Sequence, residues 1–268
     1  MQTAWIPFFS YNLWNLFEPA IGQEQWHCSM KRGFLKVRAK EPKIAALIQQ
    51  ETDCLAIGLL AQQGVYEFHQ DLRLLSDADG VRQVADILEL ASKSDEVRDR
   101  VTRILLNYHS KPILLGQEIL RLIRGDEGFP DPILIRSGNQ EYKLFAAIDC
   151  IFIEPDGTLH ILDFKTGKSE FDRRQAYVYL LAAQYLYPNR PAVASFYNLE
   201  SQTWSSRITA TNVQLQVLEM DIFQLAQQHQ RDLHRYKRQA VPFKEVFPPH
   251  PGYQCRSCQF QSVCDFAI

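Results

Sequence analysis

Apolar residues recur at helical intervals from about Lys43 to His109, with polar residues between them. Spacings of three and four residues place side chains on one face of a helix, so this stretch predicts several amphipathic helices. The preceding residues, Met1 to about Lys40, show no such period and are expected to be irregular. The recurring apolar positions are Ile44, Ile48, Leu55, Ile57, Leu59, Leu60, Val84, Ile87, Leu90, Val101, Ile104 and Leu105.

The pattern changes in the middle of the chain. Residues 142–153 (YKLFAAIDCIFI) form a continuous apolar run rich in aromatic and β-branched residues, which predicts a strand buried on both faces. Residues 155–157 (PDG) are a strong turn signal, and residues 159–164 (LHILDF) are expected to return as a second strand. We therefore predict a β-hairpin here.

The remaining pattern predicts an alternation of helices and strands. A helix is expected over residues 172–187, where Pro188 stops it, followed by a strand over 192–197 and an edge strand over 206–209. A long amphipathic helix is expected over residues 212–236. A proline-rich segment, residues 242–251, then leads to the end of the chain.

Composition narrows the class of protein. The chain has 268 residues, 46% of them hydrophobic, which is enough for one large domain or two small ones. Its 29 basic and 31 acidic side chains give a net charge of −2, which argues against nucleic-acid binding by bulk charge but allows a local basic groove. The longest apolar stretch, around Cys54 to Ala61, is too short to cross a bilayer, and no signal peptide is evident. We expect a cytoplasmic protein without membrane contact.

Two carboxylates interrupt the predicted hairpin. If its loop comprises residues 155–157, facing residues have numbers that sum to 312, which places Asp149 opposite Asp163 and Lys165 on the same face. Directly opposed residues have Cβ atoms about 5 Å apart, so two carboxylates there require a cation such as Mg²⁺. Such a site suits metal-assisted phosphodiester hydrolysis. The alternatives are solvated side chains at a strand end, or a loop of another length that separates the two aspartates.

The helix after the hairpin adds polar side chains. Gln175 and Tyr179 are four residues apart and share a helix face. Arg173, Arg174 and Lys168 lie near the start of that helix, where they could bind a phosphate backbone. Taken alone, the pair is better explained as a surface glutamine and a half-buried core tyrosine than as a binding site.

Three cysteines, Cys255, Cys258 and Cys264, form a C-x2-C-x5-C array at the C-terminal end of the sequence. Six cysteines in a chain expected to be cytoplasmic favour metal binding or buried thiols over disulfides. Thiolates grouped this closely usually hold a metal ion or an iron–sulfur cluster.

Together these residues resemble a known family. The order Asp149, Asp163-Phe-Lys165-Thr-Gly, Gln175-x-x-x-Tyr179 resembles the RecB-type nuclease domain of the PD-(D/E)xK superfamily. The terminal cysteines, with one more near the N-terminus, resemble its iron–sulfur branch, which includes the CRISPR-associated RecB-like exonucleases and the AddB nuclease domain. The resemblance spans nearly the whole chain, from Cys28 to Cys264.

The resemblance implies an α/β fold, with a restriction-endonuclease-like core whose mixed central sheet is flanked by helices. It implies one domain, residues 1–268, in which 1–110 form a mainly helical N-terminal part with Cys28. Residues 140–200 would form the catalytic core, and residues 250–268 the cysteine cluster, a C-terminal iron–sulfur staple.

The resemblance also implies roles for individual residues. Asp149 and Asp163 would bind the catalytic Mg²⁺ or Mn²⁺, and Lys165 would be the catalytic lysine. Gln175 and Tyr179 would lie beside the active site and contact DNA. The implied activity is an exonuclease on single-stranded DNA ends, working with CRISPR adaptation or recombination proteins. One departure is Gln62, which stands where the family often has a histidine.

A 4Fe–4S cluster needs four thiolates, and the fourth can be remote in sequence. Cys28 is the best candidate because its surroundings are expected to be irregular, whereas Cys54 and Cys150 fall in a predicted helix and strand and are expected to be core thiols. A structural zinc with His250 as fourth ligand, or free cysteines, are the alternatives. For function, the alternatives are a catalytically weak or inactive DNA-binding subunit and a zinc-ribbon interaction protein.

Overall fold

The computed structural model describes residues 6–19, 22, 24–50, 52–138, 140–168 and 171–268. The chain forms two compact units, each built from separate segments. The terminal unit comprises residues 1–50, 132–145 and 216–268, and the core unit comprises residues 51–131 and 146–215. That the whole chain acts as a single domain stays a prediction.

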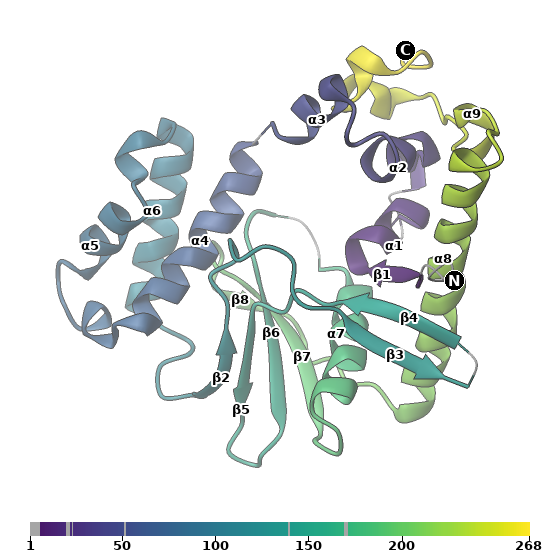
Figure 1. Ribbon diagram of the computed structural model, residues 1–268. Helices are drawn as coiled ribbons and strands as arrows, with labels where there is room; N and C mark the ends of the chain where they lie inside the picture. The colour runs from purple at the N-terminus through teal and green to yellow at the C-terminus, as the bar shows by residue number, and fades with distance from the viewer. Residues whose placement is uncertain (1–5, 20–21, 23, 51, 139, 169–170) are drawn as a thin grey trace. The chain divides into compact units, whose positions relative to one another are not determined.

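A mixed five-stranded sheet forms the centre of the core unit, in the order β2-β5-β6-β7-β8. Strands β6 and β7 run parallel, while the other neighbours are antiparallel, so the predicted mixed sheet is confirmed. Figure 1 shows β5 and β6 side by side in this sheet. The strands are β2 (Glu118–Leu122), β5 (Cys150–Ile153), β6 (Leu159–Lys165), β7 (Ala192–Asn198) and β8 (Thr203–Trp204).

The β5–β6 hairpin has the predicted register. Ile153 faces Leu159 and Cys150 faces Leu162, so facing numbers sum to 312 as expected. The Glu154 amide donates to the Thr158 carbonyl at 2.9 Å and closes the three-residue loop. The edge strand expected at residues 206–209 is reduced to a bridge between Ile208 and Ala194, and β8 forms the edge instead.

The prediction of one strand over residues 142–153 is wrong. The chain leaves β4 (Gln140–Phe145) and enters β5 only at Cys150, and the two strands belong to different sheets. A continuous apolar run reports burial on both faces, but it does not report which sheet each half pairs with. The break brings Asp149 to the entrance of β5 rather than into a strand.

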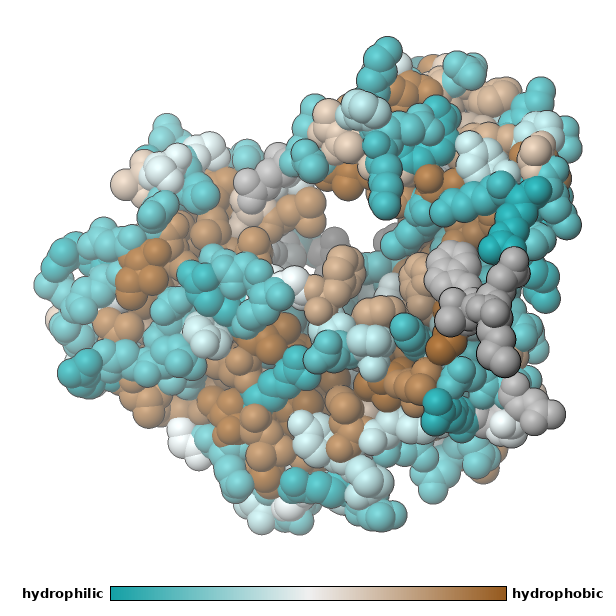
Figure 2. Space-filling model, viewed as in Figure 1, coloured by the Kyte–Doolittle hydropathy of each residue, from teal (hydrophilic) through white to brown (hydrophobic). Residues whose placement is uncertain are grey.

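Within the residues that the structure describes, α-helices α4, α5, α6 and α7 complete the core unit. Thr52 and Ser94 act as N-caps, because their hydroxyls accept from the amides of Leu55 and Val97. Helix α7 packs on β7, and α4 packs against α6. On the face in view, Figure 2 shows the region of α5 and α6 as mostly hydrophilic, as expected for amphipathic helices. The helices are α4 (Asp53–Gln70), α5 (Gly80–Ile87), α6 (Asp95–Ser110) and α7 (Arg173–Leu186).

The terminal unit contains a three-stranded sheet, ordered β1-β4-β3, and several helices. Helices α1 and α2 lie within residues 1–40, so the expectation that this region is irregular is wrong. Within the described residues, no single helix is long and apolar enough to cross a membrane, although the bent pair α3 and α4 passes that test when taken together. Its elements are β1 (Phe8–Ser10), α1 (Tyr11–Phe17), α2 (Ser29–Lys36), α3 (Pro42–Ile48), β3 (Ile133–Ser137), β4, α9 (Phe243–Val246), and α8 (Asn212–Lys237), whose first turn belongs to the core unit.

Candidate active site

The five residues predicted to form the catalytic site all lie in the core unit. Asp163 and Lys165 are on β6, Gln175 and Tyr179 are on α7, and Asp149 immediately precedes β5. Hydrogen bonds and an ion pair link the residues of β6 and α7 to one another, and Asp149 lies against the backbone of β6. The structure therefore brings all five predicted side chains together.

Asp163 is the centre of this group and is only 3% exposed. Its Oδ1 accepts hydrogen bonds from Gln175 Nε2 at 2.8 Å and from the Tyr179 hydroxyl at 2.9 Å. Its Oδ2 lies 2.6 Å from Lys165 Nζ, an ion-pair distance, yet accepts no hydrogen bond of good geometry. One oxygen of this buried carboxylate is therefore left with an ionic neighbour only.

Asp149 is half-buried at the entrance to β5. Its Oδ2 accepts a hydrogen bond from the Phe164 amide at 2.8 Å, and its carbonyl accepts from the Ile123 amide at 2.9 Å. Burial raises the pKa of the Asp149 carboxyl well above its usual range, and the negative charge of Asp163 raises it further. The Phe164 amide and the Lys165 ammonium oppose that rise without cancelling it.

Gln175 connects the lysine to the carboxylate. Its Oε1 accepts from Lys165 Nζ at 2.9 Å, and its Nε2 donates to both Asp163 and the Tyr179 hydroxyl, the latter at 2.6 Å. Every hydrogen-bonding group of this buried amide is thus satisfied. These three hydrogen bonds fix the Gln175 amide between Lys165, Asp163 and Tyr179.

Tyr179 ties the network to the chain before β5. Its hydroxyl lies 2.6 Å from the carbonyl of Ala147 and 2.9 Å from Asp163 Oδ1, and it has one proton for the two acceptors. Burial raises the pKa of Tyr179 well above its usual range, and Asp163 and Asp149 add to that shift. Tyr179 therefore remains a protonated donor.

The structure adds a contact that the sequence did not predict. Gln62 of α4 donates from Nε2 to the Ile123 carbonyl at 3.2 Å, and its side chain also lowers the pKa of Asp149. Gly125 has φ of +96°, and a Cβ there would lie 3.0 Å from the Gln62 amide. The run Arg-Gly-Asp-Glu-Gly ending at Gly128 signals a turn, but nothing in it indicates that the turn packs on α4.

The cations near the start of α7 are not equivalent. Arg174 is paired with Asp172 at 2.6 Å, which satisfies much of its charge within the protein. Arg173 and Lys168 are exposed. Of the three cations predicted to contact phosphate, these two remain accessible for that role.

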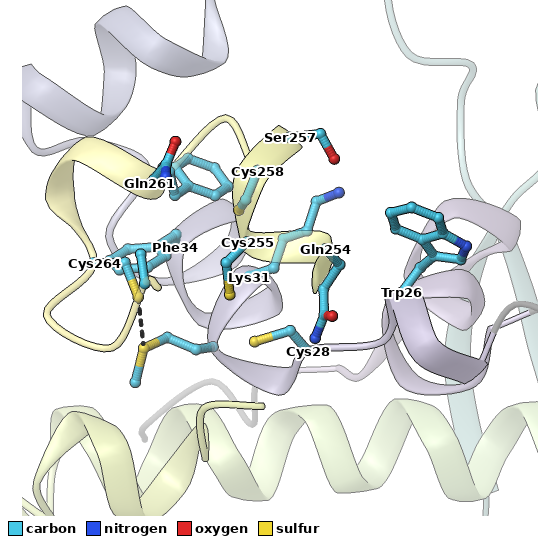
Figure 3. Close-up of a pocket in the computed structure, with 13 residues that line it drawn as sticks. Trp26, Cys28, Lys31, Phe34, Gln254, Cys255, Ser257, Cys258, Gln261 and Cys264 are labelled. Carbon is cyan, nitrogen blue, oxygen red and sulfur yellow. Dashed lines mark hydrogen bonds between the residues drawn. The ribbon is translucent and has the colours of Figure 1, made fainter. Parts of the chain in front are cut away.

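The four cysteines predicted to hold a cluster line one pocket of the terminal unit, with a cavity of about 110 Å³. Cys28 is the N-cap of α2, and the others come from the C-terminal segment, as Figure 3 shows. Burial raises the pKa of the Cys264 thiol, and the other three thiols raise it further, which reflects their proximity. Phe34 and Phe260 give the pocket an apolar wall.

The two remaining cysteines differ in burial. Cys150 is fully buried in β5, as predicted, but Cys54 is exposed on the first turn of α4. The prediction that Cys54 is a core thiol is therefore wrong. An N-terminal helical position often faces solvent, and the apolar period around Cys54 gave no information on which face it occupies.

The residues present fit a divalent ion at the carboxylate site. Among the described residues, no three histidine, cysteine or carboxylate side chains converge on a point that could hold a metal ion. Among the residues that the structure describes, the site offers Asp149 and Asp163, which matches the one or two carboxylates that Mg²⁺ commonly takes beside water and phosphate oxygens. Asp163 Oδ2, which accepts no hydrogen bond, is a suitable ligand atom.

Comparison with known protein families matches this chain to one family. The sequence profile described as "PD-(D/E)XK nuclease superfamily" matches residues 34–265. Comparison with curated proteins gives no match. A solved structure described as "Crystal structure of SSO0001" is similar at 11% identity and a TM-score of 0.33, covering 88% of this chain and 94% of that chain. At that TM-score the likeness carries no argument about function.

Proposed function

The chain belongs to the PD-(D/E)XK nuclease superfamily, and on that basis we propose that it is a Mg²⁺- or Mn²⁺-dependent DNA nuclease with its metal on Asp149 and Asp163. Membership of the family makes a nuclease the first hypothesis. The mixed α/β fold agrees with that membership. The identity of the metal, the DNA substrate and the roles of individual residues go beyond family membership and are proposed.

The observation that carries the proposal is the state of the two carboxylates. The pKa of Asp149 is raised by burial and by Asp163, so the pair resists carrying two negative charges. The buried Oδ2 of Asp163 accepts no hydrogen bond. A divalent cation held by these two carboxylates would offset their negative charge and would give Asp163 Oδ2 a partner as a ligand.

The other residues hold this arrangement. A bound divalent ion would lower the pKa of a water and offset charge developing on the scissile phosphate. Lys165 Nζ lies 2.6 Å from Asp163 Oδ2, and from there it would be able to donate to a phosphate oxygen. Gln175 and Tyr179 are buried and bonded to Asp163, so we assign them as positioning residues. Their expected contact with DNA stays a prediction.

For the terminal unit we propose a 4Fe–4S cluster held by Cys28, Cys255, Cys258 and Cys264, as in the iron–sulfur branch of RecB-type nucleases. Four thiols around one cavity support it, since a cluster needs its ligands spread around a volume rather than converging on a point. Such a cluster would close a loop of more than 220 residues and stabilise the fold by about 5 kcal/mol, by analogy with a long-range disulfide.

The substrate and the pathway that we propose come from the resemblance to RecB-type nucleases. The protein would be an exonuclease that acts on single-stranded DNA ends, in CRISPR adaptation or in recombination and repair. The partner proteins would be those of one of these pathways, and the location would be the cytoplasm.

A second candidate is a catalytically weak or inactive DNA-binding subunit that keeps the fold. One contact favours it. Gln62, at the position where the family often has histidine, is already engaged by the Ile123 carbonyl and is packed against Gly125. Its amide therefore offers less to a metal than an imidazole nitrogen would.

Cleavage assays separate the two candidates. Wild type and Asp163→Ala are incubated with labelled single- and double-stranded DNA and Mn²⁺. We expect the wild type to release nucleotides from single-stranded ends and the variant to be slower by at least about 10²-fold. Equal inertness of both proteins on both substrates would support the inactive subunit and contradict the nuclease.

A further inference from the structure

Two large aromatic rings are exposed beside the cysteine pocket. Trp26 is 46% exposed and Tyr253 is 73% exposed, and their ring centroids lie 6.4 Å apart at an interplanar angle of 67°. Trp26 lies in the short turn η1 (Glu24–Trp26) and Tyr253 begins η4 (Tyr253–Ser257). A folded protein seldom leaves two neighbouring large rings in water unless they bind something.

Two cations accompany these rings. The guanidinium carbon of Arg256 lies 5.3 Å from the centroid of the Tyr253 ring, and Lys31 lines the pocket next to Trp26 in Figure 3. Among the residues that the structure describes, neither cation has an ion-pair partner. The nearby carboxylate of Glu24 is turned to the amide of Gly22, at 3.0 Å.

We propose that this aromatic and basic lip (Trp26, Lys31, Tyr253 and Arg256) is a binding site for single-stranded nucleic acid. Exposed rings on which bases stack, with cations for the phosphates, are the recurring elements of single-strand binding. The choice of nucleic acid over a protein partner rests on the proposed function and on the two unpaired cations. Lysine is depleted at protein interfaces, so Lys31 favours nucleic acid.

The lip depends on both ends of the described chain. Trp26 and Lys31 flank Cys28, while Tyr253 and Arg256 flank Cys255. Whatever holds Cys28 beside Cys255 therefore also holds the two halves of the lip together. The cysteine pocket thus gains a binding role in addition to its role in stability.

The test measures binding without cleavage. The full chain, with the proposed 4Fe–4S cluster in its cysteine pocket, is titrated into fluorescent oligo(dT) and into a duplex of the same length. The buffer contains a chelator of divalent ions, so that DNA is bound but not cleaved. Trp26→Ala and Tyr253→Ala are compared with Trp26→Phe and Tyr253→Phe, which keep a ring. Tyr185→Ala, which removes an exposed tyrosine of α7, is the matched control. Circular dichroism confirms that each variant is folded.

We expect each alanine variant to bind oligo(dT) at least about fivefold more weakly, because a stacked base is lost. The phenylalanine variants and Tyr185→Ala should bind nearly as the wild type, and the duplex should be less affected. Lys31→Ala and Arg256→Ala should each lower the slope of log affinity against log salt by about 0.7.

Alanine variants that bind oligo(dT) as tightly as wild type would overturn the proposal, and so would equal losses for the duplex. A lip used only by a protein partner would give the first of these results. If the alanine variants bind normally and the wild type cleaves DNA, the proposed binding site is wrong and the proposed nuclease activity stands. Loss of binding in a protein that never cleaves DNA supports the lip and contradicts the nuclease.

Discussion

The side-chain amide of Gln175 donates from Nε2 to Asp163 Oδ1 at 2.8 Å, inside the cluster of predicted catalytic residues. The oxygen of the same amide accepts from Lys165 Nζ at 2.9 Å. A single planar group thus fixes the carboxylate and the ammonium relative to each other. Gln175 lies in the first turn of α7, so the helix fixes the amide beside β6.

Replacing Gln175 with alanine should slow DNA cleavage about 10- to 100-fold, because Lys165 and Asp163 lose their common support. The measurement is the single-turnover cleavage rate with Mn²⁺. Gln184→Ala is the matched control, since Gln184 is an exposed glutamine of the same helix. Equal rates for the Gln175 variant and wild type would show that the amide does not position the site.

The arrangement of the carboxylates could be predicted because it depends on local rules. A strong turn at residues 155–157 sets the loop length, the loop length sets the register, and the register brings Asp149 to Asp163. Helices α7 and α8 were also predictable, because Pro188 ends the first and a long amphipathic period marks the second.

Several features of the fold were not predicted because they depend on contacts between distant segments. The spacing of apolar residues along the sequence does not indicate such contacts. The run 142–153 divides between two sheets because β4 finds its partners in β1 and β3. The N-terminal helices lacked a clear apolar period, and their stability comes from packing, as Phe34 against Phe260 illustrates. The contact of Gln62 with Ile123 joins segments about sixty residues apart.

A buried ion pair links α2 to α8 in the terminal unit. Arg32 donates to Asp232 at 2.7 Å, and the two side chains are 5% and 4% exposed. Arg32→Met leaves the Asp232 carboxylate buried without its partner, so we expect a loss of about 3–5 kcal/mol in the free energy of unfolding. Urea unfolding measures it.

The matched control is Arg38→Met, whose partner Glu41 is at the surface. That variant should lose less than about 1 kcal/mol. The double variant Arg32→Met with Asp232→Leu should recover much of the loss, because no charge then remains buried. Similar losses for the two single variants would contradict the importance of burial.

His69 should make the protein less stable in acid. Burial lowers its pKa to about 4, so between pH 6.5 and pH 4 the unfolded chain binds more protons at this residue than the folded protein does. Stability is therefore lost as the pH falls through that window. Protonation would also abolish the acceptor at Nε2, which lies 2.7 Å from the Tyr108 hydroxyl.

His69→Gln keeps an acceptor and does not titrate. Its free energy of unfolding should fall by about 1 kcal/mol less between pH 7 and pH 5 than that of the wild type. Urea unfolding at the two pH values, without divalent metal, provides the measurement. A His69→Gln variant whose stability falls as much as that of the wild type between the two pH values would refute the assignment.

Cys28 and Cys54 should respond differently to replacement. Cys28→Ala removes one of the four thiols of the pocket, so the purified protein should lose its brown charge-transfer absorption and its C-terminal segment should become sensitive to protease. Cys54→Ala alters an exposed thiol of α4 and should change neither property. A colourless wild-type protein carrying one zinc would contradict the cluster and support the zinc alternative.

The most direct test is the binding of Mn²⁺ by the free enzyme, measured by isothermal titration beside the cleavage rate. We expect Asp149→Asn and Asp163→Asn each to abolish Mn²⁺ binding and cleavage, whereas Asp172→Asn, which alters the N-cap of α7, leaves Mn²⁺ binding intact. Mn²⁺ binding by both variants with wild-type affinity would contradict the assignment of Asp149 and Asp163 as the metal site.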